Sequence, residues 1–136
     1  MKRWKPDFDQ KYYYITDGGF LDYDYWKDTL KNNWHYLTNN IFETAREAEE
    51  YQKKIEIQCR YKKYIEEHSE ELDWENYKQD KFYLCYDYFY KYITSYGQRA
   101  CKDSFQIYAS DDQILQDAIA EIGEDNIKKY VLEVKE

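Results

Sequence analysis

The segment from Thr44 to Ser69 constrains the fold more than any other part of this sequence. It contains neither glycine nor proline, the two residues least favourable in a helix. Thr44 and Glu47 have the spacing of a capping box, in which the Thr44 oxygen caps the Glu47 N–H group and the Glu47 carboxylate reaches back. The segment therefore predicts a helix over about 44–69.

The apolar residues of this helix change face midway, at helical spacing. The first stripe consists of Ala48, Tyr51, Ile55 and Cys59. The second stripe lies on nearly the opposite side and consists of Ile57, Tyr61, Tyr64 and His68. A helix with two stripes lies between two packing partners, is kinked, or carries a second surface for association. The third interpretation predicts a homodimer through the second stripe.

Aromatic and β-branched residues predict strands on both sides of this helix. Before it, residues 12–15 and 20–26 are predicted to form a hairpin, because Asp17-Gly18-Gly19 between them is a hairpin-turn signal. Residues 34–37 are interpreted as a third, weaker strand. After the helix, the strand-like segments are residues 81–88, 90–96 and 105–108.

The last part of the sequence is typical of helices. Residues 110–113 have the pattern of a second capping box, the helix that follows is predicted to end near Gly123, and residues 124–134 predict a short terminal helix. This order of elements favours the α+β class: an antiparallel sheet with one long helix (about 44–69) packed on it and two short C-terminal helices. The length of 136 residues fits a single domain over 1–136.

Composition limits the classes of function. Of 136 residues, 18 are tyrosine, which favours a folded chain with aromatic recognition surfaces. The net charge of -8 disfavours direct binding to nucleic acid or to anionic membranes and steers a chain toward basic protein partners. Three cysteines without close spacing indicate a reducing compartment, and no segment has the apolar length of a membrane helix, so a cytoplasmic protein is expected.

No catalytic, cofactor or metal signature accompanies these features. His35 and His68 lie apart from the three cysteines, and a zinc site usually needs a closely spaced pair of such ligands. The sequence therefore predicts a binding protein that is not an enzyme and has neither cofactor nor metal. Acidic clusters and tyrosines of the second stripe supply the candidate partner-binding residues, which are Asp22, Asp24, Glu66, Glu67, Glu70, Glu71, Asp73, Glu75, Tyr61 and Tyr64.

Three parts of the chain together resemble a family of small accessory proteins encoded by phages and prophages of low-GC Gram-positive bacteria. They are the opening Trp4-Lys5-Pro6 with residues 11–15, the helix start at 40–49, and residues 107–110 with 119–129. Residues 85–104 depart most from the family pattern. The resemblance implies a phage accessory protein acting in the host cytoplasm, and it carries over no catalytic residue.

By analogy with other acidic phage proteins, the resemblance implies an inhibitor of a host defence system. The hypothesis is an anti-CRISPR protein and DNA mimic, whose acidic, tyrosine-rich surface binds a Cas9-type effector and blocks its nucleic-acid-binding site. Two alternatives stay open. One is a sponge that binds a nucleotide signal, which needs a cation such as Arg3, Arg46, Arg60 or Arg99 in its pocket. The other is a phage structural or interaction module.

Overall fold

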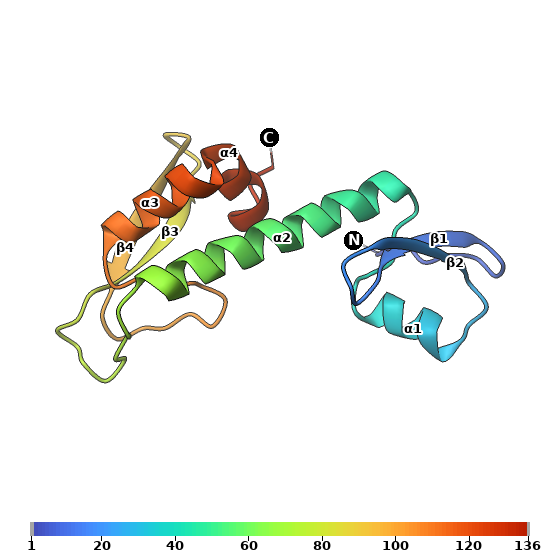
Figure 1. Ribbon diagram of the computed structural model, residues 1–136, viewed down its shortest axis with the longest axis horizontal. Coiled ribbons are helices and arrows are strands. Elements are labelled where there is room, and N and C mark those ends of the chain that lie inside the picture. Colours follow the sequence, from blue (N-terminus) through green and yellow to red (C-terminus); the bar gives the residue numbers. More distant parts are fainter. Residues whose placement is uncertain (1, 136) are drawn as a thin grey trace. The chain divides into compact units, whose positions relative to one another are not determined.

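The computed structural model describes residues 2–135 and confirms the α+β class, the long helix and the short C-terminal helices (Figure 1). Its elements are β1 (Lys11–Ile15), β2 (Leu21–Tyr25), α1 (Leu30–Leu37), α2 (Ala45–His68), β3 (Lys81–Asp87), β4 (Tyr92–Gln98), α3 (Asp112–Ile122), α4 (Glu124–Asn126) and the π-helix η1 (Ile127–Val131). The chain divides into two compact units, residues 1–54 (unit 1) and 55–136 (unit 2). The expectation of a single domain stays a prediction.

In unit 1 the predicted hairpin is confirmed: β1 pairs antiparallel with β2. Its turn closes where the Thr16 N–H donates to the Phe20 carbonyl at 2.8 Å, with Gly19 at φ 85°. The buried face is aromatic, and its core consists of Tyr12, Tyr14, Trp26 and Ile41. Aromatic rings bury a large apolar area each, which lets a short hairpin build a core of its own.

The strand predicted at residues 34–37 is wrong, because these residues form the last turn of α1. A capping box starts this helix: the Asn32 N–H donates to Thr29 Oγ1 at 3.1 Å, and the Thr29 N–H donates to Asn32 Oδ1 at 3.3 Å. The buried residues of the helix are Asn32 and His35, three positions apart, which is a helical spacing. A cap on Thr29 therefore decides the structure of a segment whose aromatic composition suggests a strand.

The start of α2 is confirmed as predicted. Thr44 Oγ1 accepts the Glu47 N–H at 3.2 Å, and Ala48, one turn further on, is fully buried. Just before the helix, Tyr13 and Phe42 exchange two backbone hydrogen bonds of 2.8 and 2.9 Å in an isolated antiparallel bridge. This bridge ties the entrance of α2 to the first strand of the hairpin.

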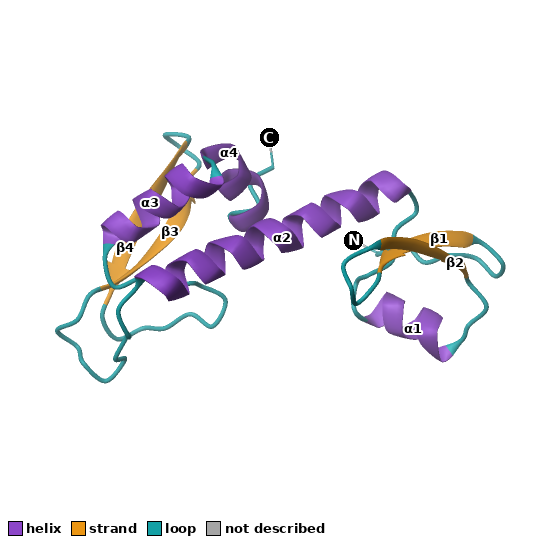
Figure 2. Cartoon of the chain, viewed as in Figure 1, coloured by secondary structure: helices purple, strands orange, loops and turns teal. Residues whose placement is uncertain are grey.

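Unit 2 repeats the hairpin and adds more helix. β3 and β4 pair antiparallel, as predicted, and α3 lies along this hairpin (Figure 1). The connections at 69–80 and 99–111 contain no helix or strand (Figure 2). One apolar core joins α2, β3, α3 and η1, and its fully buried members include Ile57, Tyr61, Ile65, Leu84, Leu115, Ala118 and Ile127.

Three details of the prediction for this part are wrong. The strands form two separate two-stranded sheets and not one sheet, because each hairpin pairs only with itself. Residues 105–108 form no strand; the bridge to the hairpin lies one residue later, where Ala109 and Phe82 exchange two backbone hydrogen bonds of 2.8 Å. The capping box predicted over residues 110–113 is also wrong, because the cap of α3 is Asp111, whose side chain accepts the Gln113 N–H at 2.7 Å, while Ser110 Oγ accepts the Glu70 N–H.

The two units thus share a structural plan that the sequence does not reveal. In each, a hairpin is joined through one antiparallel bridge, at Phe42 or Ala109, to a segment that enters a capped helix. The cap lies two residues after the bridge in both, at Thr44 and at Asp111. Within residues 2–135 no helix combines the length and the apolarity that crossing a bilayer requires.

Candidate binding sites

A buried hydrogen-bond network joins α1 to the β1–β2 hairpin. Asn32 is 1% exposed, and its Oδ1 accepts the N–H groups of Lys27 at 2.8 Å and Thr29 at 3.3 Å. These two donors fix the orientation of the amide, so that Nδ2 faces the hairpin and donates to the Tyr12 hydroxyl at 2.8 Å. The Tyr12 hydrogen is therefore directed to His35 Nδ1, 2.7 Å away.

The network holds His35 in its neutral form. The imidazole stacks on Tyr14 with ring centres 4.0 Å apart. Burial, and next the positive charge of Lys31, lower the pKa of His35, while Asp24 and Asp17 act in the opposite direction. Since Nδ1 accepts a hydrogen bond, the ring proton resides on Nε2.

A cavity of about 500 Å³ lies beside this histidine, and its wall includes Lys31, Trp34 and Tyr51. The Lys31 ammonium is 5.0 Å from the Tyr14 ring centre and 3.7 Å from Asp24 Oδ2. Within residues 2–135, no buried side-chain polar atom of this network lacks a hydrogen-bond partner. The network is therefore explained by its structural role, which is to hold α1 on the hairpin.

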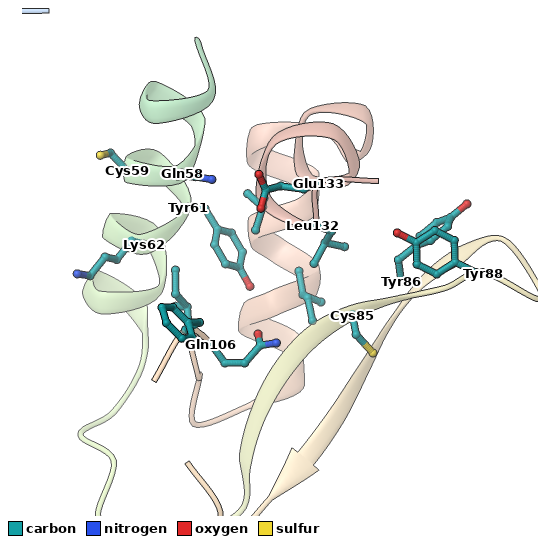
Figure 3. A pocket seen from close by; sticks show the side chains of 14 residues that line it. Gln58, Cys59, Tyr61, Lys62, Cys85, Tyr86, Tyr88, Gln106, Leu132 and Glu133 are labelled. Carbon is teal, nitrogen blue, oxygen red and sulfur yellow. The ribbon is translucent and has the colours of Figure 1, made fainter. Parts of the chain in front are cut away.

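The cavity in unit 2 differs because a buried polar atom beside it has no hydrogen-bond partner among the described residues. Its volume is about 690 Å³, and Figure 3 shows Tyr61 extending into it from α2, with Gln106 nearby. Tyr61 is 2% exposed, and its hydroxyl is the one buried side-chain polar atom in the described part of the chain that has no hydrogen-bond partner. Burial raises the pKa of Tyr61, so the group stays a neutral phenol that can donate one hydrogen bond.

The walls of this cavity are mostly apolar and carry little charge. The aliphatic and aromatic lining residues are Leu84, Ile107, Val131, Leu132, Tyr86, Tyr88 and Phe105. The charged ones are Lys62, whose Nζ lies 3.9 Å from Glu66 Oε1, and Glu133. No arginine lines the cavity. A nucleotide-signal sponge needs more positive charge than this around its phosphates.

The turn between β3 and β4 presents a group of exposed aromatic side chains, here called the aromatic tip: Tyr88, Phe89 and Tyr90. Asp87 holds the turn, because its Oδ1 accepts the N–H groups of Phe89 and Tyr90, each at 2.9 Å. The Lys91 N–H closes the turn onto the Asp87 carbonyl at 2.7 Å. Phe89 is 83% exposed. The hydrogen bonds therefore fix the backbone that carries three solvent-exposed rings.

The predicted residues of β2 do not form a free acidic face. The β1–β2 register puts Asp22 and Asp24 on the same face as the buried tyrosines, where Tyr14 donates to Asp22 Oδ2 at 3.3 Å and Asn32 donates to Asp24 Oδ2 at 3.3 Å. The outward-facing side chains are instead the apolar ones, Leu21, Tyr23 and Tyr25, which are 37 to 52% exposed. The alternation is as predicted, with Asp22 exposed and Asp24 half-buried, and both carboxylates accept hydrogen bonds from the buried side of the hairpin.

The second acidic cluster is exposed and consists of two parts. On α2, Glu66 and Glu67 lie 3.9 and 3.8 Å from Lys62 and Lys63, which partly neutralise them. The others lie in the loop before β3, here called the acidic loop: Glu70, Glu71, Asp73 and Glu75. Among residues 2–135 no ion pair engages these four carboxylates. The loop precedes β3 and the aromatic tip follows it, so they lie at opposite ends of the hairpin (Figure 1).

The second stripe of α2 lies largely inside the protein. Ile57 and Tyr61 are each 2% exposed in the core of unit 2, so they are not surface residues that a partner or a second copy contacts. Tyr64 is half-buried and stacks on the exposed His68 with ring centres 4.0 Å apart. The homodimer stays a prediction, with only these two residues of the stripe at the surface.

Cysteines and histidines do not assemble into a reactive or metal-binding group. Burial, and next the charge of Asp87, raise the pKa of the Cys85 thiol, which keeps it protonated. The other two cysteines, Cys59 and Cys101, are exposed and free. In the part of the chain that the structure describes, no three acidic, histidine or cysteine side chains are placed to hold a metal ion.

Sequence reasoning missed the residues that now matter most. Asn32 had a signal, the Thr29-x-x-Asn32 spacing of a capping box. Asp87 also had one, since an aspartate after a strand often bonds backbone N–H groups two residues on. Gln106 had none, because a loop residue reaches a cavity only through the fold. Comparison with family models, curated proteins and solved structures gave no match to this chain.

Proposed function

We propose that this chain is a protein-binding inhibitor that uses its aromatic tip as the anchor for a partner. The supporting observation is the exposure of Tyr88, Phe89 and Tyr90, at 65, 83 and 71%, on a turn that Asp87 holds in one conformation. Tyrosine and phenylalanine are enriched at protein interfaces, and hot spots are rich in tyrosine. A pre-formed turn also reduces the entropy lost on binding.

Charge supports a basic partner. The chain has a net charge of -8, and the acidic loop exposes carboxylates that are not in ion pairs within the described residues. Such a surface attracts lysines and arginines that otherwise contact phosphates. The phage-like resemblance narrows this class to a host defence effector, and we propose a CRISPR Cas9-type effector whose nucleic-acid-binding site the chain blocks.

The two surfaces make different predictions, because they lie at opposite ends of β3. Contact with a phosphate-binding channel is expected to involve the acidic loop, and anchoring is expected to involve the tip. Neutralising Glu70, Glu71 and Glu75 to glutamine should slow association, whereas truncating Phe89 should accelerate dissociation. Binding that needs neither surface would contradict the proposal as a whole.

The test is a binding measurement with a purified Cas9-type effector, with and without its guide RNA, at low salt. Phe89→Ser is expected to weaken binding by at least about tenfold, since a buried aromatic anchor typically contributes 2 kcal/mol or more. Phe20→Ser is the matched control, because Phe20 is 72% exposed in a different hairpin turn. No binding of the unmodified chain at low salt rejects this partner.

A further inference from the structure

We infer that the cavity of unit 2 is a binding site for an uncharged planar heteroaromatic molecule of about the size of a purine nucleoside. Tyr61 donates a hydrogen bond to it. This inference does not rest on the protein partner proposed above, because it is argued from the buried Tyr61, although Tyr88 belongs both to the aromatic tip and to the cavity wall. Nothing else in the chain combines a cavity of this size with an unsatisfied buried polar group among residues 2–135.

The Tyr61 hydroxyl has no hydrogen-bond partner among residues 2–135. A buried polar group without a partner is destabilising, and proteins leave few such groups unsatisfied. A phenylalanine at this position would fill the core equally well and avoid that penalty. Figure 3 shows the Tyr61 side chain directed into the cavity, and because the hydroxyl is itself buried, a ligand in the cavity reaches it when a neighbouring side chain moves aside.

The walls of the cavity are aromatic on one side and aliphatic elsewhere. Tyr86 and Tyr88 line one side with their rings 5.0 Å apart and nearly perpendicular, and Leu84 and Leu132 supply aliphatic surface. Apolar and aromatic walls of this kind favour a flat ring system. The cavity volume of about 690 Å³ lies within the range typical of small-molecule sites.

The cavity also has a polar edge, formed by Tyr61 and Gln106. Gln106 belongs to the loop before α3 and Tyr61 to α2, and both side chains line the same cavity (Figure 3). A glutamine amide carries a donor and an acceptor, and this pair matches the N6 and N7 positions of adenine. Tyr61 adds a further donor. The combination recognises the edge of a heterocycle better than that of a hydrocarbon.

The charges at the cavity disfavour an anionic ligand. Lys62 lies at the cavity with its ammonium beside Glu66, and Glu133 contributes a negative charge. Phosphate groups are usually bound by several cations or by helix N-termini. A nucleoside therefore fits this lining, and adding a phosphate to it is expected to give no further affinity.

The test uses adenosine as the probe, with the melting temperature and titration calorimetry as the two measurements. Adenosine is expected to raise the melting temperature of the full chain, because a ligand that binds the folded state stabilises it by mass action. Adenosine monophosphate is expected to bind no more tightly than adenosine. Absence of a shift and of binding heat with adenosine overturns the inference.

Tyr61→Phe distinguishes a ligand-binding hydroxyl from a structural one. The variant without ligand is expected to melt at the same or a higher temperature, and its affinity for adenosine is expected to fall at least about tenfold, since a hydrogen bond lost inside a pocket contributes on this scale. Tyr77→Phe, at an exposed tyrosine, is the control. Gln106→Ala provides a second variant, and its affinity for adenosine is expected to be lower as well. A lower melting temperature of free Tyr61→Phe, or unchanged affinity in both variants, contradicts the assignment.

Discussion

Of the two histidines, His35 is buried against β1 and His68 is exposed on α2. Burial lowers the pKa of His35 below its ordinary value of about 6.5, and Lys31 lowers it further. The unfolded chain therefore binds a proton near pH 6.5, while the folded chain binds it only at lower pH. The contribution of His35 to the free energy of unfolding is therefore present at pH values above the pKa of the unfolded chain, and it is lost as the pH falls from that pKa toward the lower pKa of the folded chain.

This difference predicts that the free energy of unfolding decreases between about pH 7.5 and pH 5.5, and that His35 contributes to the decrease. Urea unfolding at the two pH values measures it. In His35→Gln the decrease is expected to be smaller, because the titrating group is gone. His68→Gln is the control and should keep the full decrease. An equal decrease in all three proteins would refute the role of His35.

The hydrogen bond from Tyr12 determines which nitrogen of His35 accepts a hydrogen at neutral pH. Burial raises the pKa of Tyr12, so its hydroxyl keeps the hydrogen that it donates to His35 Nδ1. Protonation of Nδ1 would turn it into a donor, so the Tyr12 hydroxyl would have to rotate its hydrogen away and accept instead. The present direction of the hydrogen bond therefore belongs to the neutral form of His35.

At the scale of elements, α1 is the segment whose formation depends most on one side chain. Asn32 accepts two backbone N–H groups at the helix start and donates to Tyr12, so Asn32→Ala removes the Asn32 half of the capping box, keeps the bond to Thr29 Oγ1, and leaves buried polar atoms unpaired. The expected loss of stability is about 2–4 kcal/mol, from the lost half of the capping box and the unsatisfied groups together. Urea unfolding measures the loss. Asn33→Ala, at the exposed neighbour, should cost clearly less, and equal losses would contradict this account.

The same elements explain how far sequence reasoning reached. The hairpin of β1 and β2 and the start of α2 follow from local signals, the Gly18-Gly19 turn and the Thr44 cap, and the structure confirms them. α1 was missed because the aromatic residues at 34–37 outweighed the Thr29 cap. The two separate sheets were missed because strand pairing depends on contacts between residues distant in the sequence, which local patterns do not contain.

In the candidate sites, too, some features follow from local sequence and others depend on the fold. The exposed positions of the acidic loop follow from composition, since runs of carboxylates are usually solvated. The burial of Tyr61 and the inward side of Asp24 do not, because they depend on which helix covers which face. The cavity at Tyr61 lies between α2, β3 and the last turns of the chain, and no sequence window contains all three.

At the scale of the whole molecule, the net charge of -8 predicts two salt effects of opposite sign. Repulsion among the surplus carboxylates destabilises the folded chain, and salt screens it, so the urea midpoint of the free chain should rise from about 50 to about 200 mM salt. The change is expected to be small, because the ion pairs at Lys62 and Lys63 are exposed and are screened as well.

Over the same salt range, binding to a basic partner should weaken, because screening removes the attraction that steers the two surfaces together. The affinity is expected to fall severalfold, mainly through a slower association rate, which stopped-flow or biolayer measurements resolve. The aromatic tip is expected to keep its contribution to the binding free energy, because burying Phe89 against the partner does not depend on charge. Replacing Glu70, Glu71 and Glu75 by glutamine should reduce the salt dependence, whereas Phe89→Ser should leave it unchanged. If both variants keep the full salt dependence, the charge lies elsewhere on the chain and the acidic loop is not the surface that meets the partner.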